Sequence, residues 1–133
     1  MALKFAAATR NARLQAIIDQ LGSDPILELW SGTEPANVAA VDAPDGAIIA
    51  SIQLPTTPFN TPGSGAMTLA GTWRDLSADA AGTVSHFRMT TSGGVVILQG
   101  TVGVGQEMTL DDYAPEVGES ITITACTITD GNA

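Results

Sequence analysis

The stretch that decides the fold is VSHFRMTTSGGVVILQGTVG, residues 84–103. Apolar and polar side chains alternate on both sides of Ser92-Gly93, two residue types that favour tight turns. A two-residue turn at this position places apolar residues opposite each other on one face of the two strands, Met89 with Val96 and Phe87 with Leu98. The stretch therefore predicts a β-hairpin whose apolar face is directed toward a core.

The other face of this hairpin is predicted to be a mixed surface of the sheet. Its residues are Val84, His86, Arg88 and Thr90 on the first strand, and Val95, Ile97 and Gln99 on the second. His86 is the only histidine of the chain. A Ser-His-Asp set requires a base held by a carboxylate, and the sequence has no G-x-S-x-G motif. We therefore expect His86 to be a surface position without a catalytic role.

Segments on both sides of the hairpin share its two-residue period and its β-branched residues. They are residues 26–31, 47–55 and 67–73 before it, and a short strand from residue 107 and residues 120–129 after it. In the last segment Ile121, Ile123 and Ala125 are expected on one face. The predicted fold class is mainly β, an antiparallel β-sandwich or jelly-roll-like domain of about seven or eight strands with one short N-terminal α-helix.

The helix is predicted at residues 9–21. Four apolar residues recur there at helical spacing, Leu14, Ile17, Ile18 and Leu21. Thr9 or Asn11 is suited to cap its first turn, and Gly22 is suited to end it in a left-handed conformation. The expected organisation is an N-terminal arm and helix, residues 1–22, followed by a single β-sandwich domain, residues 23–133.

Charge is distributed unevenly along the chain. Residues 1–13 carry +3 and residues 14–133 carry −12, which together give the net charge of −9. An acidic body of this kind disfavours nucleic acid and anionic membranes, because phosphate contacts require Lys and Arg. The first residues also lack the apolar run that a signal peptide or a membrane span requires, so neither is expected.

The N-terminal residues are the candidate partner-binding site. Arg10 and Arg13 lie at the helix N-terminus, where the helix dipole disfavours cations, and two apolar residues precede the helix. We predict that an attachment element formed by Leu3, Lys4, Phe5, Arg10 and Arg13 docks on an acidic, partly apolar patch of a neighbouring protein. Two alternatives remain open: the helix covers the open end of the sandwich in its own subunit, or the three cations form an ordinary solvated helix start.

The remaining candidates for chemistry are weak. Cys126 is the single cysteine and lies within a predicted strand, which indicates a buried structural thiol. Asp75, Ser77 and Asp79 have the spacing of calcium ligands, but the sixth position of that loop is Ala80 and the twelfth is His86. We therefore predict no metal, no cofactor and no enzymatic activity.

Several segments together resemble small proteins encoded by tailed bacteriophages and prophages. They are the MALKFAAATRNARLQAI start, LELWSGTEPAN, LAGTW, AGTVSHFRM, SGGVVILQGTVG and the ITITACTITDGNA end. The resemblance covers nearly the whole chain and implies a structural protein of the virion, assembled in the bacterial cytoplasm. It brings no catalytic residues with it.

The first function that this resemblance implies is that of a capsid decoration or cement protein. Its partners would be other virion proteins, above all the major capsid protein, and further copies of itself, but no nucleic acid and no membrane. A second interpretation is a connector or fibre-associated module of the tail, neck or baseplate. A third, from another class, is a carbohydrate-binding module or a small hydrolase.

Overall fold

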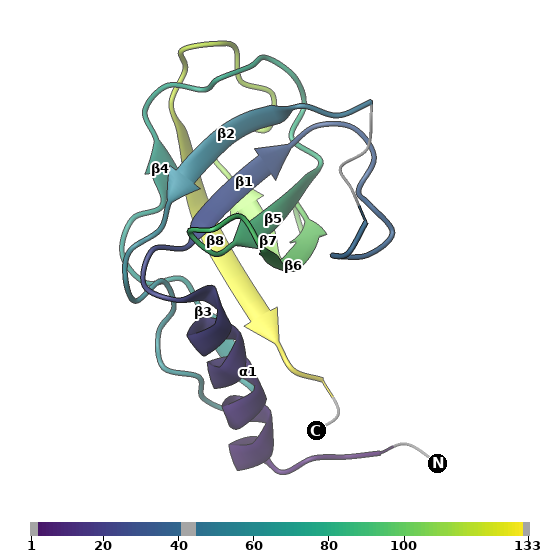
Figure 1. Cartoon of the computed structure of the whole chain (residues 1–133), viewed down its shortest axis with the longest axis vertical. Helices are drawn as coiled ribbons and strands as arrows, with labels where there is room; N and C mark the ends of the chain where they lie inside the picture. Colours follow the sequence, from purple (N-terminus) through teal and green to yellow (C-terminus); the bar gives the residue numbers. More distant parts are fainter. Residues whose placement is uncertain (1–2, 41–44, 132–133) are drawn as a thin grey trace.

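The computed structural model describes residues 3–40 and 45–131. Within these residues the chain forms one helix, α1 (Ala7–Leu21), followed by eight strands in two antiparallel sheets (Figure 1). The protein is therefore mainly β, as the alternating pattern predicts. Both ends of the described chain lie at the end of the molecule where α1 stands, and the loop that precedes β8 lies at the opposite end (Figure 1).

The first sheet has the order β2-β1-β5-β6, with antiparallel neighbours throughout. Its strands are β1 (Ile26–Trp30), β2 (Ile48–Gln53), β5 (His86–Thr90) and β6 (Val96–Thr101). The predicted strands at residues 26–31 and 47–55 correspond closely to β1 and β2. The predicted hairpin corresponds to β5 and β6.

The second sheet is organised around its longest strand, β8 (Ile121–Thr129). Three short strands pair with β8 in succession along its length: β4 (Arg74–Asp75), β7 (Met108–Leu110) and β3 (Ala66–Thr68). The single strand predicted at residues 67–73 is wrong in its length. The chain turns at Gly71, which has a φ of 74°, so that β3 ends at Thr68 and the separate strand β4 begins only at Arg74.

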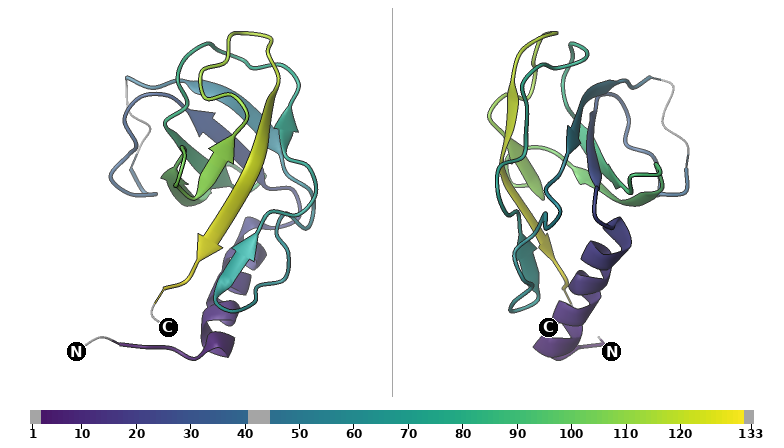
Figure 2. Two further views of the ribbon diagram at one scale, coloured as in Figure 1. Left: turned by 180° about the vertical axis from the view of Figure 1, so that it is seen from behind. Right: turned by 60° about the vertical axis from the view of Figure 1, so that its left-hand side comes forward.

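Buried side chains of both sheets form one hydrophobic core. At its centre the rings of Phe59 and Trp73 meet edge to face with 5.2 Å between their centroids, a favoured arrangement of two aromatic rings. Leu14 and Leu21 of α1 are also buried in this core. The helix therefore belongs to the same folded unit as the sheets, and it stands beside β3 below the first sheet (Figure 2).

The predicted start of the helix is corrected by the structure. The helix begins at Ala7, and Ala6 precedes it without any side-chain capping hydrogen bond. Thr9 and Asn11 are therefore interior residues of α1 and not its N-cap. Gly22 ends the helix with a φ of 79°, as predicted for a residue that must adopt a left-handed conformation.

The hairpin differs from its predicted register by two residues. Met89 lies opposite Leu98 and Phe87 lies opposite Gly100. One residue of the difference comes from a three-residue loop, closed by the Thr91 amide donating to Val95 at 2.9 Å. The other comes from a bulge beside Met89. A shift of one residue moves each side chain to the other face, and a second shift moves it back. The apolar face of the hairpin is therefore as predicted, although the cross-strand residue pairs are not.

A second bulge changes the facing of residues within β8. The partners of Thr109 and Leu110 on β8 are Ala125 and Ile123, so one extra residue of β8 lies between them. Ile121 and Ile123 are buried as predicted, but Ala125 is exposed and Cys126 takes the inward position. The prediction that Ala125 faces the core is therefore wrong, because the bulge reverses the alternation.

Candidate functional site

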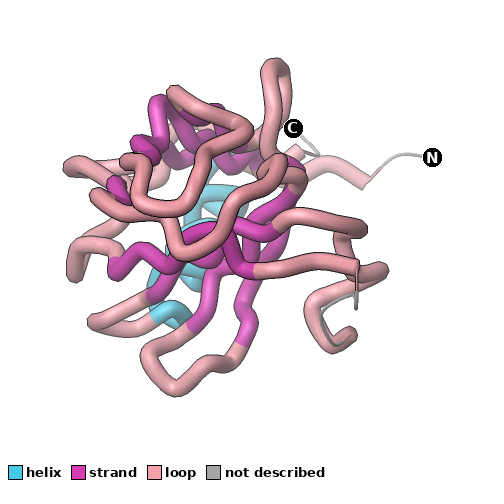
Figure 3. Tube along the Cα trace, turned by 90° about the horizontal axis from the view of Figure 1, so that it is seen from above, coloured by secondary structure: helices cyan, strands magenta, loops and turns pink. Residues whose placement is uncertain are grey.

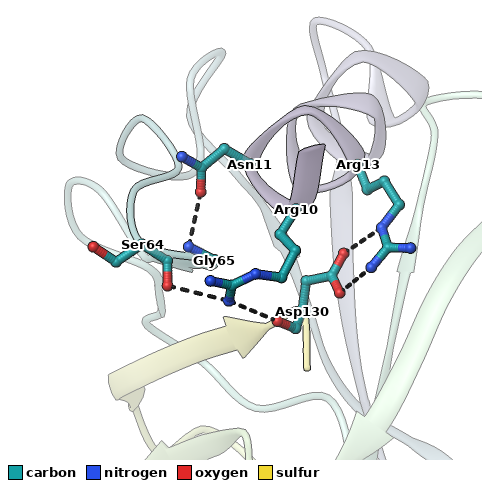
Figure 4. A network of polar contacts seen from close by, with 6 residues as sticks. All are labelled: Arg10, Asn11, Arg13, Ser64, Gly65 and Asp130. Carbon is teal, nitrogen blue, oxygen red and sulfur yellow. Dashed lines mark hydrogen bonds and ion pairs between the residues drawn. The ribbon is translucent and has the colours of Figure 1, made fainter. Parts of the chain in front are cut away.

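The predicted attachment residues lie around the first turns of α1. Arg13 forms a two-pronged ion pair with Asp130, in which its Nε donates to Oδ2 at 2.6 Å and its Nη2 pairs with Oδ1 (Figure 4). The same guanidinium lies 4.1 Å from the centre of the Phe5 ring, within the range of a cation–π contact. Arg13 therefore joins the segment before the helix to the segment after β8.

Arg10 and Asn11 bind the turn that precedes β3. Arg10 Nη1 donates to the carbonyls of Ser64 at 3.5 Å and Asp130 at 3.3 Å, and Asn11 Oδ1 accepts from the Gly65 amide at 2.8 Å (Figure 4). A Cβ on Gly65 would lie 1.8 Å from Arg10 Nη1. A side chain at position 65 would displace the arginine, and the φ of 75° at Gly65 is one that residues other than glycine rarely adopt.

These contacts give both arginines partners within their own chain. Because α1 begins earlier than predicted, Arg10 ends its first turn and Arg13 lies in the second, where the helix dipole is weaker than the predicted start at residue 9 implied. Both arginines have carbonyl or carboxylate acceptors close by, and no external acid is needed to explain their positions. Phe5 is half-buried beneath Arg13, whereas Leu3 is 68 % exposed and Lys4 is exposed. Partner binding by this element stays a prediction, and its exposed part consists of Leu3, Lys4 and Arg13.

A second cluster of polar residues was not predicted as a site. It lies on the outer face of the first sheet, where His86, Arg88 and Thr90 are 2 %, 2 % and 3 % exposed. Strand β5 is thus buried on both faces. The prediction that His86 is a surface position is wrong, because the loop between β1 and β2 packs over this face of the sheet.

Side chains of the hairpin bind the backbone of that loop. Arg88 Nη2 donates to the carbonyls of Val38 and Ala40, each at 3.0 Å. Gln99 Nε2 donates to the Pro35 carbonyl at 2.7 Å. Hydrogen bonds from a charged donor are the stronger kind, so Arg88 is the principal anchor of the loop among these contacts.

The two ends of the loop are also joined to each other. Thr33 donates to Asp45 from its hydroxyl at 2.8 Å and from its amide at 3.3 Å, and these bonds lower the pKa of the Asp45 carboxyl. Gly32 approaches so closely that a Cβ on it would lie 2.6 Å from Gly46 Cα. The loop therefore has a closed base at the end of β1.

His86 takes part in structural contacts at the same base. Its ring stacks on Trp30 with 6.3 Å between centroids, and its Nδ1 lies 2.8 Å from Ser85 Oγ. That hydroxyl donates to the Gly32 carbonyl at 2.6 Å. A base that activates serine must accept the serine proton, and the shortest acceptor contact of this hydroxyl is the Gly32 carbonyl rather than the imidazole. The arrangement holds β5 to the start of the loop.

Metal sites, pockets, membrane spans and the single cysteine are the remaining candidates for function within residues 3–40 and 45–131. These residues contain no group of three or more His, Cys, Asp or Glu side chains placed to hold a metal, and they enclose no pocket. No helix among them is long and apolar enough to cross a membrane. Cys126 is 1 % exposed, as predicted for a structural thiol, and burial raises its pKa to about 12.

Comparisons with models of known protein families, with curated proteins and with solved structures find no match to this chain.

Proposed function

We propose that this protein is a capsid decoration (cement) protein of a tailed bacteriophage, which stabilises contacts between subunits of the major capsid protein. The sequence resemblance described above is the origin of this proposal. On the same ground we propose that the protein belongs to the virion and is assembled in the bacterial cytoplasm. The strand pattern of the sequence supports the finer description of the two sheets as a jelly-roll-like β-sandwich. Its action is the burial of surface against a partner, without catalysis.

The observation that carries the proposal is the N-terminal segment before α1, which projects from the molecule while contacts at its base hold it in place. The segment before α1 leaves the body of the molecule with Leu3 68 % exposed (Figure 1). Its base is fixed by the Arg13–Asp130 ion pair and by Phe5 beneath Arg13. An apolar side chain held outward on a fixed base loses little conformational entropy on binding, which favours an attachment role.

The polar contacts of the described residues agree with a non-catalytic role. Ser85 and His86 bind the loop base, as described above. The thiol of Cys126 is buried, and its raised pKa keeps it protonated at neutral pH. Each of these reactive residue types is therefore occupied by a structural contact or by burial.

The proposal is tested by Leu3→Asp, with Leu76→Asp as its matched control. Leu76 is 70 % exposed and follows β4, at the other end of β8 from the arm. Burial of a leucine contributes about 1.5–3 kcal/mol, so Leu3→Asp should weaken binding to capsids that lack the protein about 10- to 100-fold. Leu76→Asp should bind such capsids like wild type. Equal binding by both variants would contradict an attachment role for the arm.

Copy number separates the cement role from the connector role. Quantitative mass spectrometry of purified virions should find this protein at a number comparable to the major capsid protein. A few tens of copies or fewer would instead favour the tail, neck or baseplate interpretation. Absence of the protein from purified virions would contradict both.

A further inference from the structure

The outer face of the second sheet carries an array of threonines. The side chains on this face are Thr68 of β3, Thr109 of β7, and Thr122, Thr124, Thr127 and Thr129 of β8, with Ala66 and Ala125 between them. Four of these threonines are exposed and two are half-buried. This set of residues is called the threonine face below.

Strand pairing holds the threonine face in a fixed geometry. Thr68 lies directly opposite Thr127 across β3 and β8. The hydroxyls of Thr109 and Thr124 are 2.7 Å apart and hydrogen-bonded across β7 and β8. Threonine has a restricted χ1 rotation, so the face presents methyl and hydroxyl groups in set positions. Contact with a partner would therefore order few side chains.

The threonine face differs in charge from the chain as a whole. The protein carries a net charge of −9, yet residues 120–129 contain no charged side chain. Charged residues lie at the border of the face. Arg74 is opposite Thr122. The exposed Glu107 and Asp111 lie at the two ends of β7, where the Glu107 carbonyl and the Asp111 carboxylate accept from backbone amides of β8. Two copies of an acidic protein repel each other where carboxylates meet. The threonines and alanines of the face carry no charge themselves, so two copies can approach along β8 and β3 with Glu107 and Asp111 at the border beside β7.

The opposite broad face of the molecule is already covered. The loop after β1 lies on the outer side of the first sheet, whereas β8 runs along the opposite surface (right-hand view of Figure 2). Seen from above, the helix lies beneath the strands and loops surround them (Figure 3). We infer that two copies of this chain stack their threonine faces about a two-fold axis. The occupant of the open face is thus a second copy of the same chain.

The size of the face predicts the strength of this contact. Nine residues of β8 extend about 30 Å, and three strands are about 14 Å wide. Two such faces bury about 800 Å² in total, which is below the roughly 1,200–2,000 Å² of stable specific interfaces. The contact is therefore weak in solution. The biological use of so weak a contact rests on the proposed function: many copies held side by side on a capsid would associate more strongly than two free copies, because binding becomes multivalent.

Sedimentation equilibrium of the purified protein tests this inference without any virion. From about 10 μM to about 1 mM, the weight-average mass of the wild type should rise from 13.6 kDa toward twice that value. A double variant, Thr124→Glu with Thr127→Glu, places like charges across the two-fold axis. It should weaken association at least about tenfold. The matched control, Ser92→Glu with Thr101→Glu, carries the same added charge on exposed positions of the hairpin and should associate like wild type.

A lysine pair at the same two positions excludes a general effect of charge. Thr124→Lys with Thr127→Lys makes the chain less acidic, which would strengthen association if net charge alone governed it. Like charges across the two-fold axis should instead weaken it, and an equimolar mixture of the glutamate and lysine variants should restore it. Monomeric wild type at about 1 mM, stronger association of the lysine variant, or no recovery in the mixture would each overturn the inference.

A circular dichroism spectrum and a thermal melt accompany each variant. If the glutamate variant does not fold, the lysine variant and the wild-type concentration series still decide the outcome. The result is independent of the capsid-binding test. Loss of capsid binding by Leu3→Asp with a monomeric wild type would leave the proposed function standing and remove the stacking inference.

Discussion

The outer faces of the two sheets differ in what lies on them and in what covers them. On the first sheet, His86, Arg88 and Thr90 lie beneath a loop whose carbonyls Arg88 binds. On the second sheet, an uncharged row of threonines is open. Both faces show the polar alternation of an exposed strand. The comparison shows that the sequence period reports which side faces the core, and not whether the other side meets solvent.

The difference has a physical basis in the side chains themselves. An arginine on a strand reaches far enough to bind the backbone of a loop, and its five donors satisfy several carbonyls. Threonine is too short to do so: on the second sheet, Thr109 bonds with Thr124 across the strands and Thr68 accepts from the adjacent Asn60. The first face is therefore part of the fold, and the second is free for a partner.

The largest effect is expected from Arg88→Met. This variant removes two charge-assisted hydrogen bonds to the loop and leaves the Val38 and Ala40 carbonyls without their donor. The free energy of unfolding should fall by about 3–5 kcal/mol, measured by urea denaturation. Arg74→Met is the control, because Arg74 is exposed on β4, and it should change stability by less than about 0.5 kcal/mol. Similar effects of the two substitutions would contradict the difference between the faces.

Burial of Cys126 on the inner side of β8 should make the stability of the protein depend on pH. Burial raises the pKa of Cys126 from an ordinary value of 9.0 to about 12. The unfolded thiol therefore loses its proton above pH 9, while the folded one keeps it. The free energy of unfolding should fall by about 1.4 kcal/mol per pH unit between these values. Other groups titrate in the same range, so the measurement is the difference in slope between wild type and Cys126→Ala. Identical slopes would mean that the thiol is not buried.

A smaller effect is expected where the second sheet meets the helix. Asp130→Asn keeps the shape of the side chain and removes the ion pair with Arg13. Because Arg13 is 41 % exposed, solvent weakens the pair, and the loss of stability should be about 0.5–1 kcal/mol. The loss should shrink in 1 M salt, where charges are screened within about 3 Å. Glu116→Gln, at an exposed loop position, is the control, and an equal loss there would show that the ion pair contributes nothing specific.

The smallest effect on stability is expected on the threonine face. Thr127→Val preserves the branched shape of an exposed strand residue, so the free energy of unfolding should change by less than about 0.5 kcal/mol. The matched substitution on the covered face is Thr90→Val at a position that is 3 % exposed. Thermal denaturation measures both variants. A larger loss of stability for Thr127→Val than for Thr90→Val would contradict the difference between the open and the covered face.

Much of the fold was predictable because it depends on local patterns. The alternation at residues 26–31, 47–55 and 84–103 located β1, β2 and the β5–β6 hairpin, and the helical spacing located α1. The two bulges were not predictable, because neither Met89 nor the Thr124-Ala125 segment carries a residue type that marks one. The break at Gly71 was predictable in principle, because a glycine within a strand pattern indicates a bend. The predicted strand at residues 67–73 nevertheless continued through it.

The candidate sites were less accessible from the sequence. The alternation placed His86, Arg88 and Thr90 on one face correctly, but the loop that buries them is a tertiary contact without a local signal. The only hint was two long charged or aromatic side chains, Arg88 and His86, on a strand facing a loop rich in turn formers. Similarly, Arg10 and Arg13 were recognised as unusual, but their acceptors Ser64 and Asp130 lie far away in the chain.

The central claim, that the threonine face meets a second copy while the loop-covered face does not, is tested most directly by cross-linking. Stacked sheets lie about 10 Å apart, so Thr124→Cys is treated with a bis-maleimide of about that reach. Val38→Cys, on the loop over the first sheet and 40 % exposed in the native residue, is treated in parallel, and buried Cys126 stays unreacted. The account predicts cross-linked dimers for Thr124→Cys and monomers for Val38→Cys. Equal cross-linking at both positions, or none at Thr124→Cys, would contradict it.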